Sequence, residues 1–114
     1  MRKADKERLQ KIVSYWDELR AEIDLSNITK QKILTDTKTQ WMITTPLYNI
    51  GEQVYKLTPE LKNNYPNMPW YKVAGFRHRL VHEYEEIDWE IVSDIIFSHM
   101  DDFVNSVREI LKTI

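Results

Sequence analysis

Apolar residues recur every three or four positions through most of the 114 residues of this chain. Because an α-helix turns once in about 3.6 residues, this spacing gathers them on one side of a helix. The first such stretch predicts an amphipathic helix from about residue 3 to 23, with apolar positions at Leu9, Ile12, Val13, Trp16, Leu19 and Ile23. The second is a seam that steps alternately by four and three residues, at Ile43, Leu47, Ile50, Val54 and Leu57.

Local signals divide the rest of the chain into further helices. Pro46 falls inside the seam, and because it removes a backbone donor we expect it to kink or break that helix. Thr58 and Pro59 are typical of an N-cap and a first helical residue, and they open a short helix to about residue 64. A loop over 63–69 then precedes a helix from about 69 to 83. Asp88 caps a last helix, whose predicted buried stripe is Val92, Ile95, Ile96, Phe103, Val107, Ile110 and Ile114.

Residues that suit tight turns are scarce. Two glycines and four prolines leave little turn chemistry for a many-stranded β fold, so we predict one all-α domain over 1–114. Short connections favour an antiparallel bundle of four to five helices. The absence of cysteine excludes a disulfide scaffold and thiolate metal sites. The charged N-terminus lacks the apolar segment of a signal peptide, and we expect a cytoplasmic protein.

The net charge of −2 gives the whole molecule no attraction to nucleic acid, so a polyanion site has to be local. Residues 70–88, WYKVAGFRHRLVHEYEEID, are such a place, because they hold two of the three histidines and no acidic residue up to His82. On an ideal helix His78 and His82 are ~40° apart, and Arg77 and Tyr84 are ~20° apart. Arg77 and His82 are ~140° apart, so a site that uses both needs the reach of the long Arg77 side chain, fraying of the helix near Glu83, or a second copy of the chain. The last of these makes a dimeric site attractive.

These residue types suit metal-independent cleavage of RNA. A neutral imidazole at His82 or His78 can take the proton of a ribose 2′-hydroxyl, and an imidazolium can protonate the leaving 5′-oxygen. Arg77 would bind the phosphate and stabilise the charge of the transition state. Lys72 and Arg79 are candidates for further substrate binding. This chemistry needs no cofactor.

Other functions fit the same residues. Spacing alone favours a purely structural or solvated basic face. His78 and His82 could instead bind a metal as part of a metal-dependent enzyme, with Glu86 as a candidate third ligand, although no H-E-x-x-H pattern accompanies them. His99 lies on the predicted apolar stripe and is expected to be a core histidine. The four tryptophans are expected to be core or interface anchors, at Trp16, Trp41, Trp70 and Trp89.

The string W-x(4)-G-F-R-H-R-L-V-H-E-Y-x-x-I-D-x-x-I-V resembles the signature of HepT-like proteins, the toxin halves of toxin–antitoxin pairs within the HEPN superfamily. Three shorter elements occur in the expected order, namely Ile50-Gly51-Glu52, Leu57-Thr58-Pro59-Glu60 and Pro69-Trp70. The resemblance covers essentially the full length and is strongest from Leu47 to Val92. It implies a homodimeric all-α bundle and a metal-independent endoribonuclease.

Residue by residue, Arg77 and His82 match the family's catalytic arginine and histidine, and His78 matches the polar position after the arginine, where Asn is usual. Tyr84 matches the tyrosine that a partner nucleotidyltransferase of the MNT type modifies with AMP to silence the toxin. The resemblance thus implies a type VII-like HEPN/MNT system. The alternative is a non-catalytic HEPN-fold dimer that binds nucleotide, RNA or a partner protein. Pro46 departs from the uninterrupted helix that the family resemblance implies.

Overall fold

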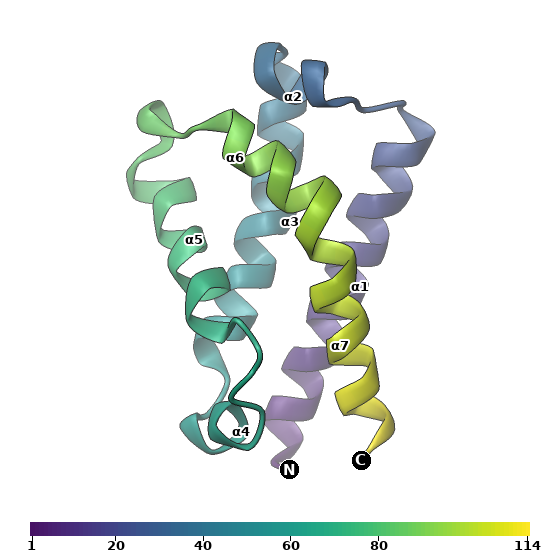
Figure 1. The fold of residues 1–114 in the computed structure, drawn as a ribbon, viewed down its shortest axis with the longest axis vertical. Helices are drawn as coiled ribbons and strands as arrows, with labels where there is room; N and C mark the ends of the chain where they lie inside the picture. Colours follow the sequence, from purple (N-terminus) through teal and green to yellow (C-terminus); the bar gives the residue numbers. More distant parts are fainter.

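The chain folds into an all-helical bundle, described by a computed structural model that covers all 114 residues. Three long helices, α1 (Lys3–Leu25), α3 (Thr37–Lys56) and α5 (Trp70–His82), run alternately up and down (Figure 1). Two short helices connect them, α2 (Lys30–Thr35) before α3 and α4 (Pro59–Asn64) before α5. The predicted all-α class is therefore confirmed, and so are the predicted extents of α1, α4 and α5 to within about two residues. None of the helices combines the length and the apolar character that crossing a membrane requires.

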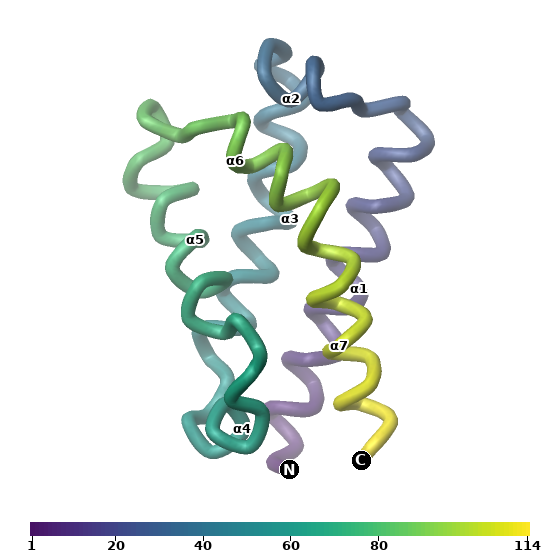
Figure 2. Tube along the Cα trace, in the orientation of Figure 1, coloured from purple at the N-terminus to yellow at the C-terminus, as the bar shows by residue number.

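The last part of the chain is helical as predicted, but it is not one regular helix. It consists of α6 (Trp89–Asp94), a π-helical turn η2 (Ile95–His99) and α7 (Met100–Lys112). The trace in Figure 2 shows this run descending obliquely from the end of the bundle near α2; α6 packs against α2 and α7 packs against α1. Asp88 caps α6 as predicted, because its Oδ1 accepts the N–H groups of Glu90 at 3.0 Å and Ile91 at 3.4 Å.

Most of the predicted apolar positions form the core. The α1 positions are buried except Val13, which packs against the core from its edge, and every residue of the 43–57 seam is buried. Trp16 and Trp70 are 2% exposed and donate their indole N–H groups to Asp101 Oδ1 and the Tyr65 carbonyl, each at 3.0 Å. Trp41 is 60% exposed and is not a core residue.

The structure corrects three details. Helix α3 is not broken at Pro46, because that proline removes only one donor while Ile43 and Leu47 on either side stay buried in the core. Ile114 is 50% exposed, so the apolar stripe of the last helix ends before the C-terminus. His99 is not a core histidine: its side chain is 67% exposed, and Nε2 lies 3.3 Å from Asp94 Oδ2.

Helix α4 is held by a buried carboxylate on α1. Asp5 is 1% exposed and accepts the backbone N–H of Thr58 at 3.0 Å and its hydroxyl at 2.5 Å. The Thr58 hydroxyl oxygen in turn accepts the N–H of Leu61, which confirms the predicted N-cap. Asp5 thereby fixes the turn between α3 and α4.

Candidate active site on helix α5

Helix α5 lies against α3 with almost no space between the two backbones at one point. A Cβ atom placed on Gly51 of α3 would lie 2.5 Å from Arg77 Cβ and 3.3 Å from the Val73 carbonyl oxygen. Because real Cβ atoms do not approach so closely, this crossing requires glycine at position 51. The close approach sets the direction in which Arg77 leaves α5.

Arg77 is held against α3 by two side chains. Its Nε lies 3.2 Å from Glu52 Oε1, and its guanidinium carbon lies 4.0 Å from the centre of the Tyr55 ring. The Nε atom is buried without an aligned hydrogen bond, so the contact with Glu52 is ionic rather than a directed hydrogen bond. Glu52 also faces Lys56 Nζ at 3.6 Å. The two terminal nitrogens of Arg77 make no hydrogen bond within the chain. Their N–H groups are therefore available to bind an anion.

Sequence reasoning missed the roles of Glu52 and Tyr55. Both lie on α3, one helical turn apart, and the Gly51-Glu52 pair beside Tyr55 is the only sequence signal that could have found them. The signal is visible in retrospect because a glycine inside a helix often marks a close approach of another backbone.

His78 and His82 form a pair on the outer face of α5. Their ring centres are 4.5 Å apart and the ring planes are tilted by 34°. Both side chains are exposed, and neither ring makes a hydrogen bond within the chain. The shared stripe predicted from their spacing is thus confirmed. Arg77 turns instead toward α3, so the structure does not bring it together with the histidine pair in one chain.

Tyr84 does not continue the stripe of Arg77. Helix α5 ends at His82, and Tyr84 begins a 3₁₀ turn, η1 (Tyr84–Glu86). Its ring packs edge-on against Trp89, with ring centres 5.8 Å apart. The Tyr84 hydroxyl is buried and has no hydrogen-bond partner. The prediction that Arg77 and Tyr84 share one stripe of a helix is therefore wrong.

The other predicted basic residues of α5 line two separate hollows. Lys72 lines an apolar groove between α5 and α7, with Phe76 and Phe103 among its walls. Arg79 lies beside Glu83 and the 3₁₀ turn, in a small hollow. No group of three or more histidine, cysteine, aspartate or glutamate side chains is arranged to hold a metal ion, so Glu86 does not join the two histidines.

Aromatic and apolar side chains flank the histidine pair on the surface. Tyr71, about two turns before His78 on α5, is 74% exposed, and Val81 is 50% exposed. Tyr55 of α3, against which Arg77 packs, is also exposed, at 58%. The outer face of α5 therefore combines two free imidazoles with apolar surface of a kind that marks contact sites.

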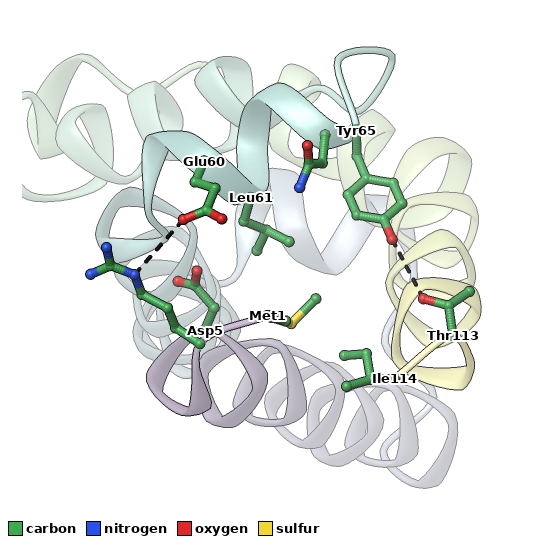
Figure 3. A pocket seen from close by; sticks show the side chains of 9 residues that line it. Met1, Asp5, Glu60, Leu61, Tyr65, Thr113 and Ile114 are labelled. Carbon is green, nitrogen blue, oxygen red and sulfur yellow. Dashed lines mark hydrogen bonds and ion pairs between the residues drawn. The ribbon is translucent and has the colours of Figure 1, made fainter.

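A second hollow lies at the end of the bundle where both chain ends meet α4. Figure 3 shows its lining, with ion pairing between Arg2 and Glu60 at 3.9 Å and a hydrogen bond of 3.4 Å between Tyr65 and Thr113. The lining includes Asp5, whose carboxylate already accepts hydrogen bonds from Thr58. These contacts tie the chain ends to α4 and contain no group poised for catalysis.

Comparisons with known proteins place the chain in a family. The sequence model of the family described as ribonuclease HepT-like matches residues 6–110. A Methanocaldococcus jannaschii protein named "Putative RNase MJ0127" is 37% identical over 93 residues, which are 81% of this chain and 77% of the relative. The "Probable ribonuclease HepT" of Thermococcus cleftensis is 31% identical over 70 residues, 58% of this chain and 64% of that protein. No solved structure matches the chain significantly. Because the family model spans nearly all of it, this chain belongs to the HepT-like ribonuclease family.

Proposed function

We propose that this protein is an endoribonuclease that cleaves RNA without a metal ion. The observation that carries the proposal is the pair of exposed imidazoles, His78 and His82, with ring centres 4.5 Å apart and no partner within the chain. One neutral imidazole takes the proton of a ribose 2′-hydroxyl while the 2′-oxygen attacks the adjacent phosphorus. The other, protonated, gives a proton to the 5′-oxygen as the bond from phosphorus to that oxygen breaks. The products are a 2′,3′-cyclic phosphate and a 5′-hydroxyl.

Arg77 binds the phosphate in this mechanism. Its terminal nitrogens present two parallel donors, which match two phosphate oxygens. Stacking on Tyr55 and the ionic contact with Glu52 restrict its movement, so the donors are oriented before RNA binds. Glu52 and Tyr55 act as positioning residues, because neither reaches the reacting atoms in this arrangement.

The active form is a homodimer in which two α5 helices face each other. Arg77 and the histidine pair leave α5 on different sides, so a partner copy completes the site by supplying Arg77 opposite the histidines of the first. The exposed Tyr71 and Val81 supply apolar area for such a contact. Sedimentation of the tag-free protein tests this: a species of twice the 13.8 kDa chain mass is expected, and a monomer that cleaves RNA at full rate would contradict it.

The chemistry is tested by RNA cleavage in EDTA. Cleavage that persists in the chelator and leaves a 2′,3′-cyclic phosphate supports the mechanism. Loss of activity in EDTA that added metal restores would support a metal-dependent enzyme instead. An RNA with a single 2′-deoxy sugar at a mapped cleavage site is the matched control, because it lacks the attacking group and should stay intact at that position.

Within the cell the enzyme acts as the toxin of a HEPN/MNT pair of the type VII-like class, silenced when a partner nucleotidyltransferase transfers AMP to Tyr84. The buried hydroxyl of Tyr84 means that turn η1 has to open before transfer. A buried hydroxyl without a partner costs about 1–3 kcal/mol, which favours such opening. Mass spectrometry after co-expression with the neighbouring nucleotidyltransferase should show AMP on Tyr84 and none in Tyr84→Phe. Neutralisation of the toxin with an unmodified Tyr84 would contradict this switch.

A further inference from the structure

His78 and His82 have the sequence spacing of two metal ligands on one helix, and their rings lie side by side. They lie one helical turn apart on α5, and the ring centres are 4.5 Å apart with a tilt of 34°. The third histidine of the chain provides a contrast, because His99 Nε2 lies 3.3 Å from Asp94 Oδ2. The paired rings of α5 have no such partner, so their nitrogens are available to an ion from solvent.

Imidazole nitrogen is a common ligand of Zn²⁺, Cu²⁺ and Ni²⁺. Residues four apart on a helix are neighbours, and zinc-binding helices use two histidines at this spacing. No third side chain of the chain joins the pair. Water would fill the remaining coordination positions, so the bound ion would exchange readily with solvent.

We propose that His78 and His82 together bind one divalent transition-metal ion of the Zn²⁺ type, and that this ion inhibits the enzyme. Each neutral imidazole has one nitrogen with a free lone pair, and metal coordination occupies it. The same nitrogen is needed to accept a proton from RNA, so metal binding and proton transfer exclude each other. The proposed metal binding depends only on the arrangement of the two histidines. The proposed inhibition rests on the proposed ribonuclease function.

The ion is expected to inhibit rather than activate. Catalytic zinc sites use three protein ligands to hold the ion and leave one position for the reacting water. Here two ligands leave the ion loosely fixed and do not orient a bound water on the RNA. The bound ion also occupies the imidazole nitrogens on which the metal-free mechanism depends.

Binding is tested by NMR titration of the tag-free protein with ZnCl₂, because a histidine tag would itself bind the metal. The ring signals of His78 and His82 should shift together and saturate at one ion per chain. His78→Ala and His82→Ala should each weaken binding by about tenfold or more, since the second ligand then no longer binds intramolecularly. The matched control His99→Ala should bind as the wild type does.

Three results would overturn the metal site: no shift of either ring, a shift confined to His99, or full affinity in one of the two alanine variants. Circular dichroism of each variant shows whether loss of binding reflects unfolding, and His78→Gln, which keeps a polar side chain but loses the imidazole, gives a second measurement. It should lose the zinc-induced shift of His82.

Inhibition is tested by adding ZnCl₂ to the RNA cleavage assay at concentrations that saturate the NMR signals. Cleavage should fall in step with occupancy and return on addition of EDTA, while an unrelated metal-independent ribonuclease controls for zinc bound to RNA. Unchanged or faster cleavage at saturation would overturn the inhibition. If the metal-free protein cleaves no RNA at all, the proposed function fails, and the NMR titration still decides the metal site.

Discussion

Gly51 on α3 and Arg77 on α5 meet where the two helices approach most closely, and a Cβ atom on Gly51 would lie 2.5 Å from Arg77 Cβ. The next residue of α3, Glu52, lies 3.2 Å from Arg77 Nε. The same short segment of α3 therefore leaves room for Arg77 and holds its guanidinium group in place.

Gly51→Ala should separate α3 from α5. The added methyl group meets the backbone region of Arg77 rather than a flexible tip, and overpacking of this kind costs about 1–3 kcal/mol. Gly75→Ala is the matched control, because a Cβ at that helical position has no atom within 4 Å; it should stabilise by about 0.5–1 kcal/mol. Urea denaturation of both variants measures the difference. Equal stability would show that the close approach is not required.

Arg77→Lys should reduce kcat/KM for RNA by about 100-fold, in the range found when one transition-state donor is lost. Lysine keeps the charge but offers no planar pair of donors and stacks less well on Tyr55. Circular dichroism checks that the fold is intact. A variant that cleaves at the wild-type rate would mean that charge alone suffices and that the orientation of the guanidinium is irrelevant.

Glu52→Gln tests whether Arg77 has to be positioned. The amide keeps the shape of Glu52 but not its charge, so Arg77 should lose orientation and kcat should fall while KM changes little. Lys56→Gln is the control, because it removes the other cation near Glu52, whose Nζ lies at 3.6 Å, without touching Arg77. A rise in cleavage in Glu52→Gln would show that Glu52 competes with RNA for Arg77 instead.

Asp5→Ala should destabilise the whole bundle. It leaves the partly buried N–H of Thr58 without its partner, a loss of about 1–3 kcal/mol. Glu7→Ala, two residues away on the exposed side of α1, should change stability by less than about 0.5 kcal/mol. Thermal unfolding compares the two, and similar effects would show that the contact between α1 and α4 contributes nothing.

Burial lowers the pKa of the Lys62 amine, whose side chain lies under Tyr71 and near the Tyr55 carbonyl. Between the lowered pKa and 10.5 the unfolded chain binds more protons than the native one, so Lys62 adds stability as pH rises through that window. Below that pH window the Lys62 amine is charged in the native protein, and its burial lowers the free energy of unfolding. Lys62→Met should therefore be more stable than wild type at neutral pH, with a gain that shrinks toward pH 10.5. A gain that is independent of pH would contradict this.

The sequence was sufficient for features that depend on neighbours along the chain. Helical spacing located the core of α1 and α3, and Thr58 and Asp88 were correct N-caps because capping needs only a side chain and the next turn. The pairing of His78 with His82 followed from the same local geometry. The family resemblance, carried by residues 47–92, is confirmed by the family model.

Features that depend on packing between helices could not be predicted in this way. Glu52 meets Arg77 only because α3 and α5 cross at Gly51, and a glycine in a helix does not reveal which other segment approaches it. The π turn at Ile95–His99 has no sequence mark of its own. Helix α5 ends before Tyr84, and the acidic side chains that follow are unfavourable beside the negative end of a helix dipole.

The most direct measurement of the central claim is RNA cleavage by His82→Ala beside His99→Ala. Both variants remove one exposed imidazole, but only His82 belongs to the paired rings of α5. The account predicts that His82→Ala, folded as judged by circular dichroism, loses RNA cleavage and cell toxicity together, while His99→Ala keeps both. RNA cleavage by His82→Ala at the wild-type rate would contradict the account.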